Sequence, residues 1–188
     1  MTTIDSLEEH IETFKSLSPS IEPLEDLANV MSTCLNNGNK IMWMGNGGSA
    51  SQSQHFAAEL VGRFNIERAG LASVSLSSDT AVITAVGNDY DFSNIYARQV
   101  EGIGYRNDIL VGITTSGNSI NIVKAFEMAR KMSIKTIGMT GISAGKIEKL
   151  CDQILCVPSK NTARIQEAHL WMGHVLCGLI EKKTSLPN

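Results

Sequence analysis

The sequence predicts an α/β fold, in which a doubly wound, mostly parallel sheet of five strands is flanked by helices. From residue 40 onwards, short apolar runs alternate with segments of helical periodicity, which is the pattern of repeated strand–helix–strand units. The runs are apolar at nearly every position, as expected for strands that are covered on both faces. No repeat or linker divides the 188 residues, so we expect a single domain over residues 1–188.

The N-terminal region, residues 1–38, is expected to form a helical hairpin. Apolar residues recur at helical spacing over 5–37, with a break at Ser18-Pro19-Ser20 and a fitting helix end at Asn36-Asn37-Gly38. A hairpin ahead of the first strand cannot be a crossover between parallel strands. It must pack on the flank of the sheet or on another subunit, and we expect it to take part in oligomer contacts.

Residues 39–188 are expected to form the α/β core and a long C-terminal helix. The candidate strands are 40–45, 71–76, 109–113, 136–139 and 153–157, and the candidate helices are 48–64, 79–86, 93–103, 118–131, 144–151 and 162–183. In sheets of this kind, ligands bind outside the carboxyl ends of the strands. The polar segments that follow the strands are therefore the candidate binding loops.

The composition is that of an ordinary globular protein. Hydrophobic residues make up 43% and charged residues 19%, and the formal net charge is -3, so no surface for nucleic acid or anionic membrane is expected. The N-terminus is acidic and polar, unlike a signal peptide, and no apolar run approaches the ~20 residues of a membrane helix. We therefore expect a cytoplasmic protein. The four cysteines form no C-x-x-C pair and lie in apolar contexts, which indicates buried, reduced thiols.

The most informative stretch is residues 45–60, where a glycine turn joins a strand to a helix. Its turn is Gly45-Asn46-Gly47-Gly48-Ser49, and free backbone N–H groups together with the helix dipole favour negative charge at such a place. His55 and Glu59 follow at i and i+4 on one helix face. They can transfer protons or hold a metal; the alternative is an ordinary surface pair.

A second polar loop, Thr114-Thr115-Ser116-Gly117-Asn118-Ser119, follows the candidate strand 109–113. Its hydroxyl and backbone N–H groups can surround a phosphate without a lysine. The loop is neither the G-x-x-x-x-G-K-[ST] motif nor the G-x-G-x-x-G motif, so neither a nucleoside triphosphate nor a dinucleotide cofactor is expected. A ligand of sugar-phosphate size fits better, and the alternative is a hydroxyl-rich capping loop.

The remaining polar candidates lie on helices. Asn88 and Asp89 end a short helix and need no function to explain them. Gln166 and His174 point within about 80° of each other but lie about 12 Å apart along the C-terminal helix, so one ligand would reach both only at full side-chain extension or if different subunits supplied them. His169 is expected to be a core or surface residue, and His10 to be solvated.

Taken together, these segments resemble the phosphoheptose isomerase family of SIS (sugar isomerase) domains, which have a Rossmann-like fold. The resemblance covers nearly the whole chain. It rests on G-N-G-G-S at 45–49, H-F-A-A-E-L at 55–60, G-N-D-Y at 87–90, T-T-S-G-N-S at 114–119 and A-R-I-Q-E-x-H at 163–169, with His174 eight residues after Gln166.

The resemblance implies an activity and a role for each matching residue. The expected reaction converts sedoheptulose 7-phosphate to D-glycero-D-manno-heptose 7-phosphate through a cis-enediol, the first step towards ADP- or GDP-heptose precursors. Glu59 would be the catalytic base and His174 its acid–base partner. The substrate-binding residues would be Asn46, Gly47, Gly48, Ser49, Glu59, Asn88, Asp89, Thr114, Thr115, Ser116, Ser119 and Gln166, of which Thr114, Thr115, Ser116 and Ser119 would hold the phosphate.

The same resemblance implies a cofactor and an assembly. Some members of the family bind zinc through residues that match His55, Glu59, Gln166 and His174. The family forms tetramers with active sites at subunit interfaces, which suits the N-terminal hairpin and the distance between Gln166 and His174. Two positions depart from the family: Thr114 stands where Ser is frequent, and Ala163 stands where some members have an acidic residue.

Two other classes of function compete with the enzyme. A similar family member is a tetrameric regulator that binds the bacterial replication initiator; it lacks the catalytic glutamate and the final histidine and has a bulky cationic residue in its phosphate loop. Here Glu59 and His174 are present and Ser116 keeps the loop small and neutral, which favours the isomerase. A sugar-phosphate sensor with a helix-turn-helix module is not expected either, because the chain has no room for such a module and its net charge does not suit DNA binding.

Overall fold

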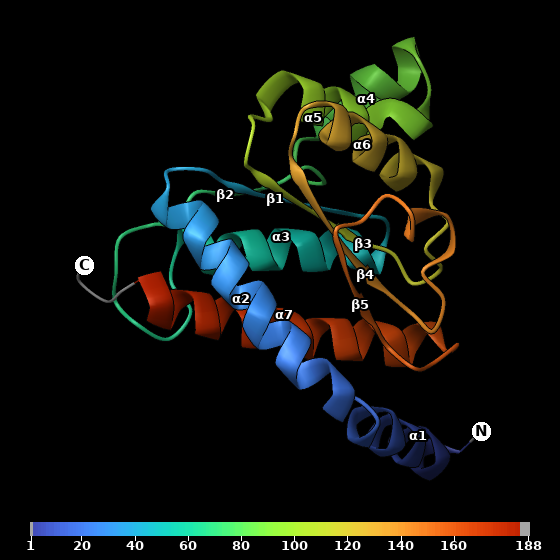
Figure 1. The fold of residues 1–188 in the computed structure, drawn as a ribbon. Coiled ribbons are helices and arrows are strands. Elements are labelled where there is room, and N and C mark those ends of the chain that lie inside the picture. Colours follow the sequence, from blue (N-terminus) through green and yellow to red (C-terminus); the bar gives the residue numbers. More distant parts are fainter. Residues whose placement is uncertain (1, 185–188) are drawn as a thin grey trace.

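Five parallel strands form one sheet in the order β2-β1-β3-β4-β5, as Figure 1 shows. The structure is a computed structural model that describes residues 2–184. The strands are β1 Ile41–Gly45, β2 Ser73–Ser75, β3 Ile109–Ile113, β4 Lys135–Thr140 and β5 Gln153–Cys156. All four neighbouring pairs are parallel, which confirms the predicted doubly wound sheet.

Seven α-helices surround this sheet in the described part of the chain. They are α1 Thr3–Lys15, α2 Ile21–Asn36, α3 Gly48–Val61, α4 Thr80–Asp89, α5 Ile95–Ile103, α6 Ile120–Lys131 and α7 Thr162–Thr184. The predicted helix 144–151 is wrong, because only the 3-10 turn Gly145–Ile147 forms there. Gly145, the first residue of that turn, has a positive φ of 54° and lies close to the side chain of Asn118, so an α-helix cannot continue through it.

Each face of the sheet has its own apolar core, as the alternation of side chains along a strand requires. In β1, Ile41 and Trp43 point towards the helices α2, α3 and α7, whereas Met42 and Met44 point towards α4, α5 and α6. All four of these side chains are fully buried. Strands covered on both faces explain why β1 and β3 are apolar along their whole length.

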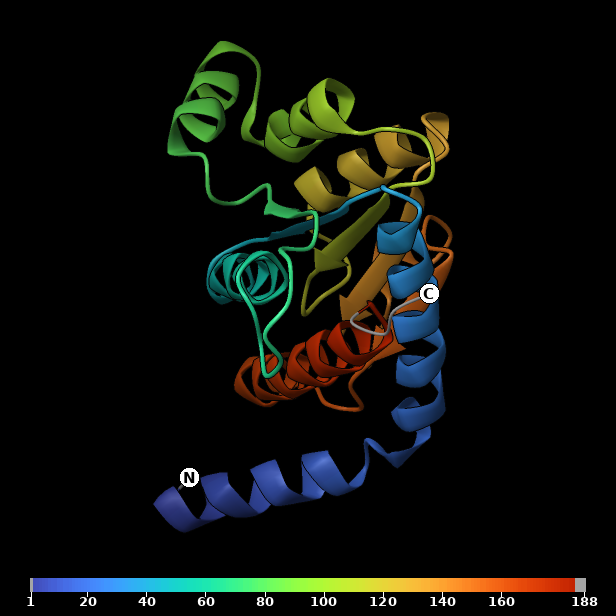
Figure 2. The same cartoon turned by 90° about the vertical axis from the view of Figure 1, so that its left-hand side faces the viewer.

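The two N-terminal helices lie at a wide angle to each other (Figures 1 and 2). α2 packs along α7, and α1 leaves the end of α2 and projects from the body, with its main contacts to α7. His10 is not simply solvated as expected: its Nδ1 lies 2.8 Å from Glu167 Oε2 and its ring stacks on Phe14. The apolar side chains of Ile4, Leu7 and Ile11 stay exposed along α1.

Two further expectations from the sequence concern the burial of the cysteines and the absence of a membrane-spanning helix. All four cysteines are free. Cys34 and Cys177 are buried as expected, but Cys151 is only partly buried and Cys156 is exposed, so the expectation of buried thiols is wrong for Cys156 and only partly met by Cys151. Cys156 follows the pleat of β5, a strand at the edge of the sheet, which exposes alternate side chains there. Across residues 2–184, none of the helices combines the length and the apolarity of a membrane span.

Candidate active site

The loops after β1 and β3 meet at the point where the strand order reverses. β1 pairs with β2 on one side and with β3 on the other, so the chain turns in opposite directions after these two strands. Asn46 from the first loop and Asn121 from the start of α6 join the two loops by reciprocal amide hydrogen bonds of 3.0 and 2.8 Å. A crevice between such loops is where open α/β sheets bind ligands.

The glycine turn of residues 45–49 is held in a conformation that suits close approach by a ligand. Gly47 has a positive φ of 57°, and the N–H group of Ser49 donates to the carbonyl of Asn46 over 3.1 Å. A Cβ atom on Gly48 would lie only 2.7 Å from the amide nitrogen of Gln166. Tyr96 donates its hydroxyl to the carbonyl of Gly45 from below the turn, and burial raises the pKa of that hydroxyl.

The hydroxyl loop of residues 114–119 curls back at the end of β3. The hydroxyl groups of Thr114 and Ser119 are 3.2 Å apart. Gly117 has a φ of +66°, and a Cβ atom there would lie 2.1 Å from the carbonyl oxygen of Ala144, so the loop after β4 presses directly on this turn. The loop predicted after this strand is therefore present, and glycine is required at its tip.

Beside the hydroxyl loop lies a pocket of about 230 Å³ built by three successive strand ends. Its lining includes Thr115 and Ser116 from the loop after β3 and Ser143 from the loop after β4. Ser159 and Lys160 come from the loop after β5. Lys160 and several hydroxyl-bearing residues thus line one small space together with Ile142 and Ile165. A cation and hydroxyl groups are side chains that can hold a phosphate.

Three of these residues were not predicted from the sequence. Asn121 fixes Asn46 but stands inside a helix that looks ordinary, so no sequence signal marks it. Ser143 and Lys160 follow the carboxyl ends of β4 and β5, so the rule that identified the first two loops also applies to them. Lys160 could have been found in this way.

His55, Glu59 and His174 come together in one chain, between α3 and α7. The Nε2 atoms of His55 and His174 are 2.8 Å apart, and Nε2 of His55 lies 3.5 Å from Glu59 Oε1. The side chain of His55 is 41% exposed and that of Glu59 is 21% exposed, so a substrate can reach both. The group is open to solvent and contains two imidazoles and one carboxylate, which can accept and donate protons in sequence.

Gln166 does not join this group. α3 and α7 run side by side in the same direction, since Gly48 faces Gln166 while His55 faces His174. Gly48 and His55 are seven residues apart, or about 10 Å along the helix. Gln166 therefore lies at the glycine turn, where its backbone carbonyl accepts from the side chain of Gln52 over 2.7 Å.

Asn88 and Asp89 lie at the end of α4 and bond only to each other among the described residues, with the Asn88 amide 2.9 Å from Asp89 Oδ1. Both are exposed. The candidate residues therefore fall into three places in one chain: the loops at the switch point, the histidine–glutamate group, and the end of α4.

The histidine–glutamate group contains the types of donor that zinc prefers, imidazole nitrogen and carboxylate oxygen. No group of three or more His, Cys, Asp or Glu side chains in residues 2–184 is arranged to hold a metal ion. The 2.8 Å between the two Nε2 atoms is a hydrogen-bond distance. The residues thus fit zinc in kind, while one chain by itself does not complete the set.

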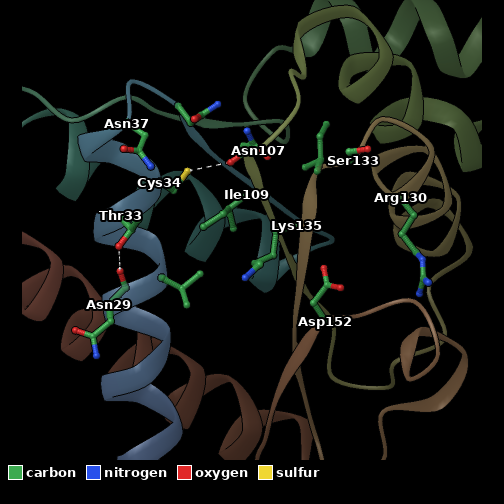
Figure 3. Close-up of a pocket in the computed structure, with 13 residues that line it drawn as sticks. Asn29, Thr33, Cys34, Asn37, Asn107, Ile109, Arg130, Ser133, Lys135 and Asp152 are labelled. Carbon is green, nitrogen blue, oxygen red and sulfur yellow. Dashed lines mark hydrogen bonds between the residues drawn. The ribbon is translucent and has the colours of Figure 1, made fainter.

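His169 is a core residue, as expected. It is fully buried, its Nε2–H group donates to the carbonyl of Thr140 over 3.0 Å, and burial lowers its pKa to about 4. A pocket of about 900 Å³ lies at the opposite, amino end of the sheet (Figure 3). Its lining includes Asn29, Asn107, Lys135 and Asp152 and none of the candidate residues.

Comparison with known proteins first defines the class. A family model described as "SIS domain" matches residues 5–141, so the chain is a SIS-domain protein. Phosphoheptose isomerases from Aliarcobacter butzleri (strain RM4018) and Helicobacter pylori (strain Shi470) are 48% and 49% identical to it. The alignment with the first covers 94% of both chains, and the alignment with the second covers 89% of this chain and 90% of the relative.

Two solved structures are similar to this chain in fold and in sequence. A phosphoheptose isomerase from Francisella tularensis superposes with a TM-score of 0.91 at 40% identity, over 97% of this chain and all of that one. One from Neisseria gonorrhoeae gives 0.90 at 40% identity, over 95% and 96% of the two chains. The chain belongs to the phosphoheptose isomerase family.

Proposed function

We propose that this enzyme interconverts sedoheptulose 7-phosphate and D-glycero-D-manno-heptose 7-phosphate, as an isomerase of heptose biosynthesis. The observation that supports this most directly is the group of three proton-transfer side chains in which His55 lies 2.8 Å from His174 and 3.5 Å from Glu59. The relatives named above are phosphoheptose isomerases. A protein that only binds a partner has no need of such a group, so the isomerase is preferred to a replication regulator.

In this proposal the phosphate binds at the hydroxyl loop. Thr114, Thr115, Ser116 and Ser119 donate hydroxyl or backbone N–H groups, and Lys160 supplies positive charge across the same pocket. The glycine turn, with Asn46 and Ser49, faces the sugar chain. Both sites lie at the carboxyl ends of parallel strands, where helix N-termini favour an anion.

The ketose-to-aldose step moves one carbon-bound proton between C1 and C2. Glu59 removes the proton from C1 of the ketose, which leaves a cis-enediol, and returns it to C2. His174 moves protons between the two oxygens, with His55 as its hydrogen-bonded neighbour. Each positioned proton-transfer group is worth about 10²–10⁴ in rate.

Glu59 lies eleven residues after Gly48 on α3, or roughly 16 Å along the helix axis, so the glycine turn and the histidine–glutamate group of one chain are well separated. In this proposal the glycine turn and the phosphate loop of one copy therefore work with the histidine–glutamate group of another. We propose a homotetramer with active sites at subunit interfaces, in which Asn88, Asp89 and Gln166 complete the site.

We also propose that the site holds zinc, through His55, Glu59 and His174, with Gln166 brought in by the assembly. Bound zinc would polarise the carbonyl group of the sugar or orient its oxygens. Metal analysis of the purified protein, with activity measured before and after chelation, tests this proposal. Activity that survives complete removal of metal would contradict it.

The proposed activity is tested by incubating the protein with sedoheptulose 7-phosphate and following the sugar phosphates by NMR. The expected result is an equilibrium mixture that contains the aldoheptose 7-phosphate. Folded, oligomeric protein that leaves the ketose unchanged, with and without added zinc, would contradict the proposal.

A further inference from the structure

Glu181 is a buried carboxylate that lies outside the residues assigned above. It sits near the end of α7, two helical turns after His174, and has no exposed surface. A buried charge is costly unless it is paired and hydrogen-bonded. What Glu181 contacts therefore indicates what it does.

Its partners lie in the loop that follows α3. One oxygen of Glu181 accepts the N–H group of Phe64 over 2.9 Å, and the other accepts those of Asn65 and Ile66 over 2.7 and 2.9 Å. Arg68 Nε lies 3.2 Å from the same carboxylate, and the side chains are 5% and 0% exposed. Burial by itself raises the pKa of Glu181, but these donors outweigh it and leave the pKa lowered.

Arg68 connects this carboxylate to the end of α3. Its guanidinium donates to the carbonyls of Glu59, Leu60 and Gly62 over 3.0, 2.9 and 3.2 Å. The last carbonyls of a helix have no partner within the helix, and a cation is favoured there. The last turn of α3, which contains Glu59, is thus closed by Arg68.

Phe64 connects the same loop to His174. Its ring stacks on the imidazole, with the centroids 5.5 Å apart and an angle of 20° between the planes. Glu181 fixes the backbone of Phe64, and Phe64 in turn covers the histidine. One buried ion pair is therefore bonded to the end of the helix that carries Glu59 and, through the backbone of Phe64, to the ring that stacks on His174.

We propose that Glu181 and Arg68 are positioning residues, which hold Glu59 and His174 at their working separation by joining the end of α3 to α7. The expected loss of rate rests on the proposed function, whereas the expected displacement of the two side chains does not. A displacement of about 1 Å at reacting groups is enough to lower rates up to about a hundredfold.

The test compares Glu181→Gln with Asp108→Asn, a matched control at the amino end of β3. Asp108 is 1% exposed, pairs with Lys40 and accepts the N–H groups of Lys40 and Tyr105. Its side-chain hydrogen bonds to residues that the structure describes go to Asn39, Lys40 and Tyr105, which lie outside α3 and α7. Both variants are expected to lower thermal stability. Glu181→Gln alone should lower kcat, by about ten- to hundredfold, with KM unchanged.

Histidine NMR of the resting protein provides a readout that does not depend on turnover. The imidazole signals of His174, assigned by their loss in His174→Gln, should shift in Glu181→Gln and stay in place in Asp108→Asn. If Glu181→Gln does not fold, Phe64→Leu, which keeps the ion pair, should reproduce the loss of kcat. Unshifted His174 signals, or equal kcat losses in Glu181→Gln and Asp108→Asn, would overturn the proposal.

Discussion

At the scale of single residues, the chemistry depends on which side chains have a partner. His55 Nε2 lies 2.8 Å from His174 Nε2 and 3.5 Å from Glu59 Oε1, so this one nitrogen can share a proton with either partner in turn. His169, on the same helix as His174, is shut away from solvent and bonded to Thr140. Two histidines five residues apart thus lie in different environments, because the turn of the helix directs His174 towards α3 and His169 towards the sheet.

Lys160 is the cation of the proposed phosphate pocket, and its removal should weaken binding of the anionic substrate. For Lys160→Ala we expect KM to rise by about tenfold, the effect of losing one charge-assisted hydrogen bond, with kcat nearly unchanged. Steady-state kinetics measure both values. Lys149→Ala, outside that pocket, is the control. An equal KM for the two variants would show that Lys160 does not take part in binding the substrate.

His169 makes stability depend on pH. Its pKa of about 4 in the folded protein lies below the value of about 6.5 in an unfolded chain, so the unfolded state binds the proton first. The part of the unfolding free energy that depends on neutral His169 is fully present above pH 6.5. It is lost as pH falls towards 4, by about 3 kcal/mol. Urea unfolding at pH 7 and pH 4.5 should show this loss. In His169→Gln, the difference in unfolding free energy between the two pH values should be smaller. A difference as large as that of the parent would show that other groups cause the loss.

At the scale of elements, the parallel pairing of α3 and α7 decides where each site residue lies. The N-terminal end of α3 brings the glycine turn to Gln166, and its C-terminal half brings Glu59 and His55 to His174. The phosphate loop depends instead on contact between the loops after β3 and β4, since Gly117 touches the backbone of Ala144. Backbone contact leaves no side chain that could move aside.

Gly117→Ala tests this contact. The new Cβ would meet the Ala144 carbonyl at 2.1 Å in a residue with positive φ, so we expect a loss of about 1–3 kcal/mol in unfolding free energy and a raised KM. Chemical denaturation and kinetics measure the two effects. Gly102→Ala is the control, because nothing lies within 4 Å of its Cβ position; a Gly117→Ala variant that behaves like it would show that the loop can shift freely.

At the scale of the whole molecule, the exposed apolar face of α1 is the observation that supports the proposed assembly. Ile4, Leu7 and Ile11 are 58%, 52% and 42% exposed on a helix that projects from the body. Apolar residues gathered in this way are typical of a surface that another chain covers.

The double variant Leu7→Lys/Ile11→Lys should therefore separate the copies. We expect a lower mass by sedimentation, a circular dichroism spectrum like that of the parent, and loss of turnover with the loss of assembly. Glu8→Lys, on the same helix, should keep both mass and activity. A parent protein that is monomeric and active, or a variant that is monomeric and fully active, would contradict a site shared between copies.

The sequence was sufficient for the sheet and its two main loops, because strand periodicity and glycine turns are local signals. It could not indicate that the 144–151 segment makes only one turn, since that depends on Gly145 packing against Asn118. It also gave no sign of Asn121, whose role comes from a partner 75 positions away. The pairing of α3 with α7, and hence the meeting of His55 with His174, is a tertiary fact that helical spacing alone did not predict.

Glu59 is proposed to move a carbon-bound proton of sedoheptulose 7-phosphate, and carrying out the reaction in D₂O tests this role. NMR should detect aldoheptose 7-phosphate that carries deuterium at C2, because the carboxyl group exchanges its proton with solvent before returning it. Glu59→Gln should slow product formation by at least about a hundredfold while the protein still binds the substrate. Product formed at an undiminished rate by Glu59→Gln, or without any deuterium at C2 from the parent enzyme, would contradict the account.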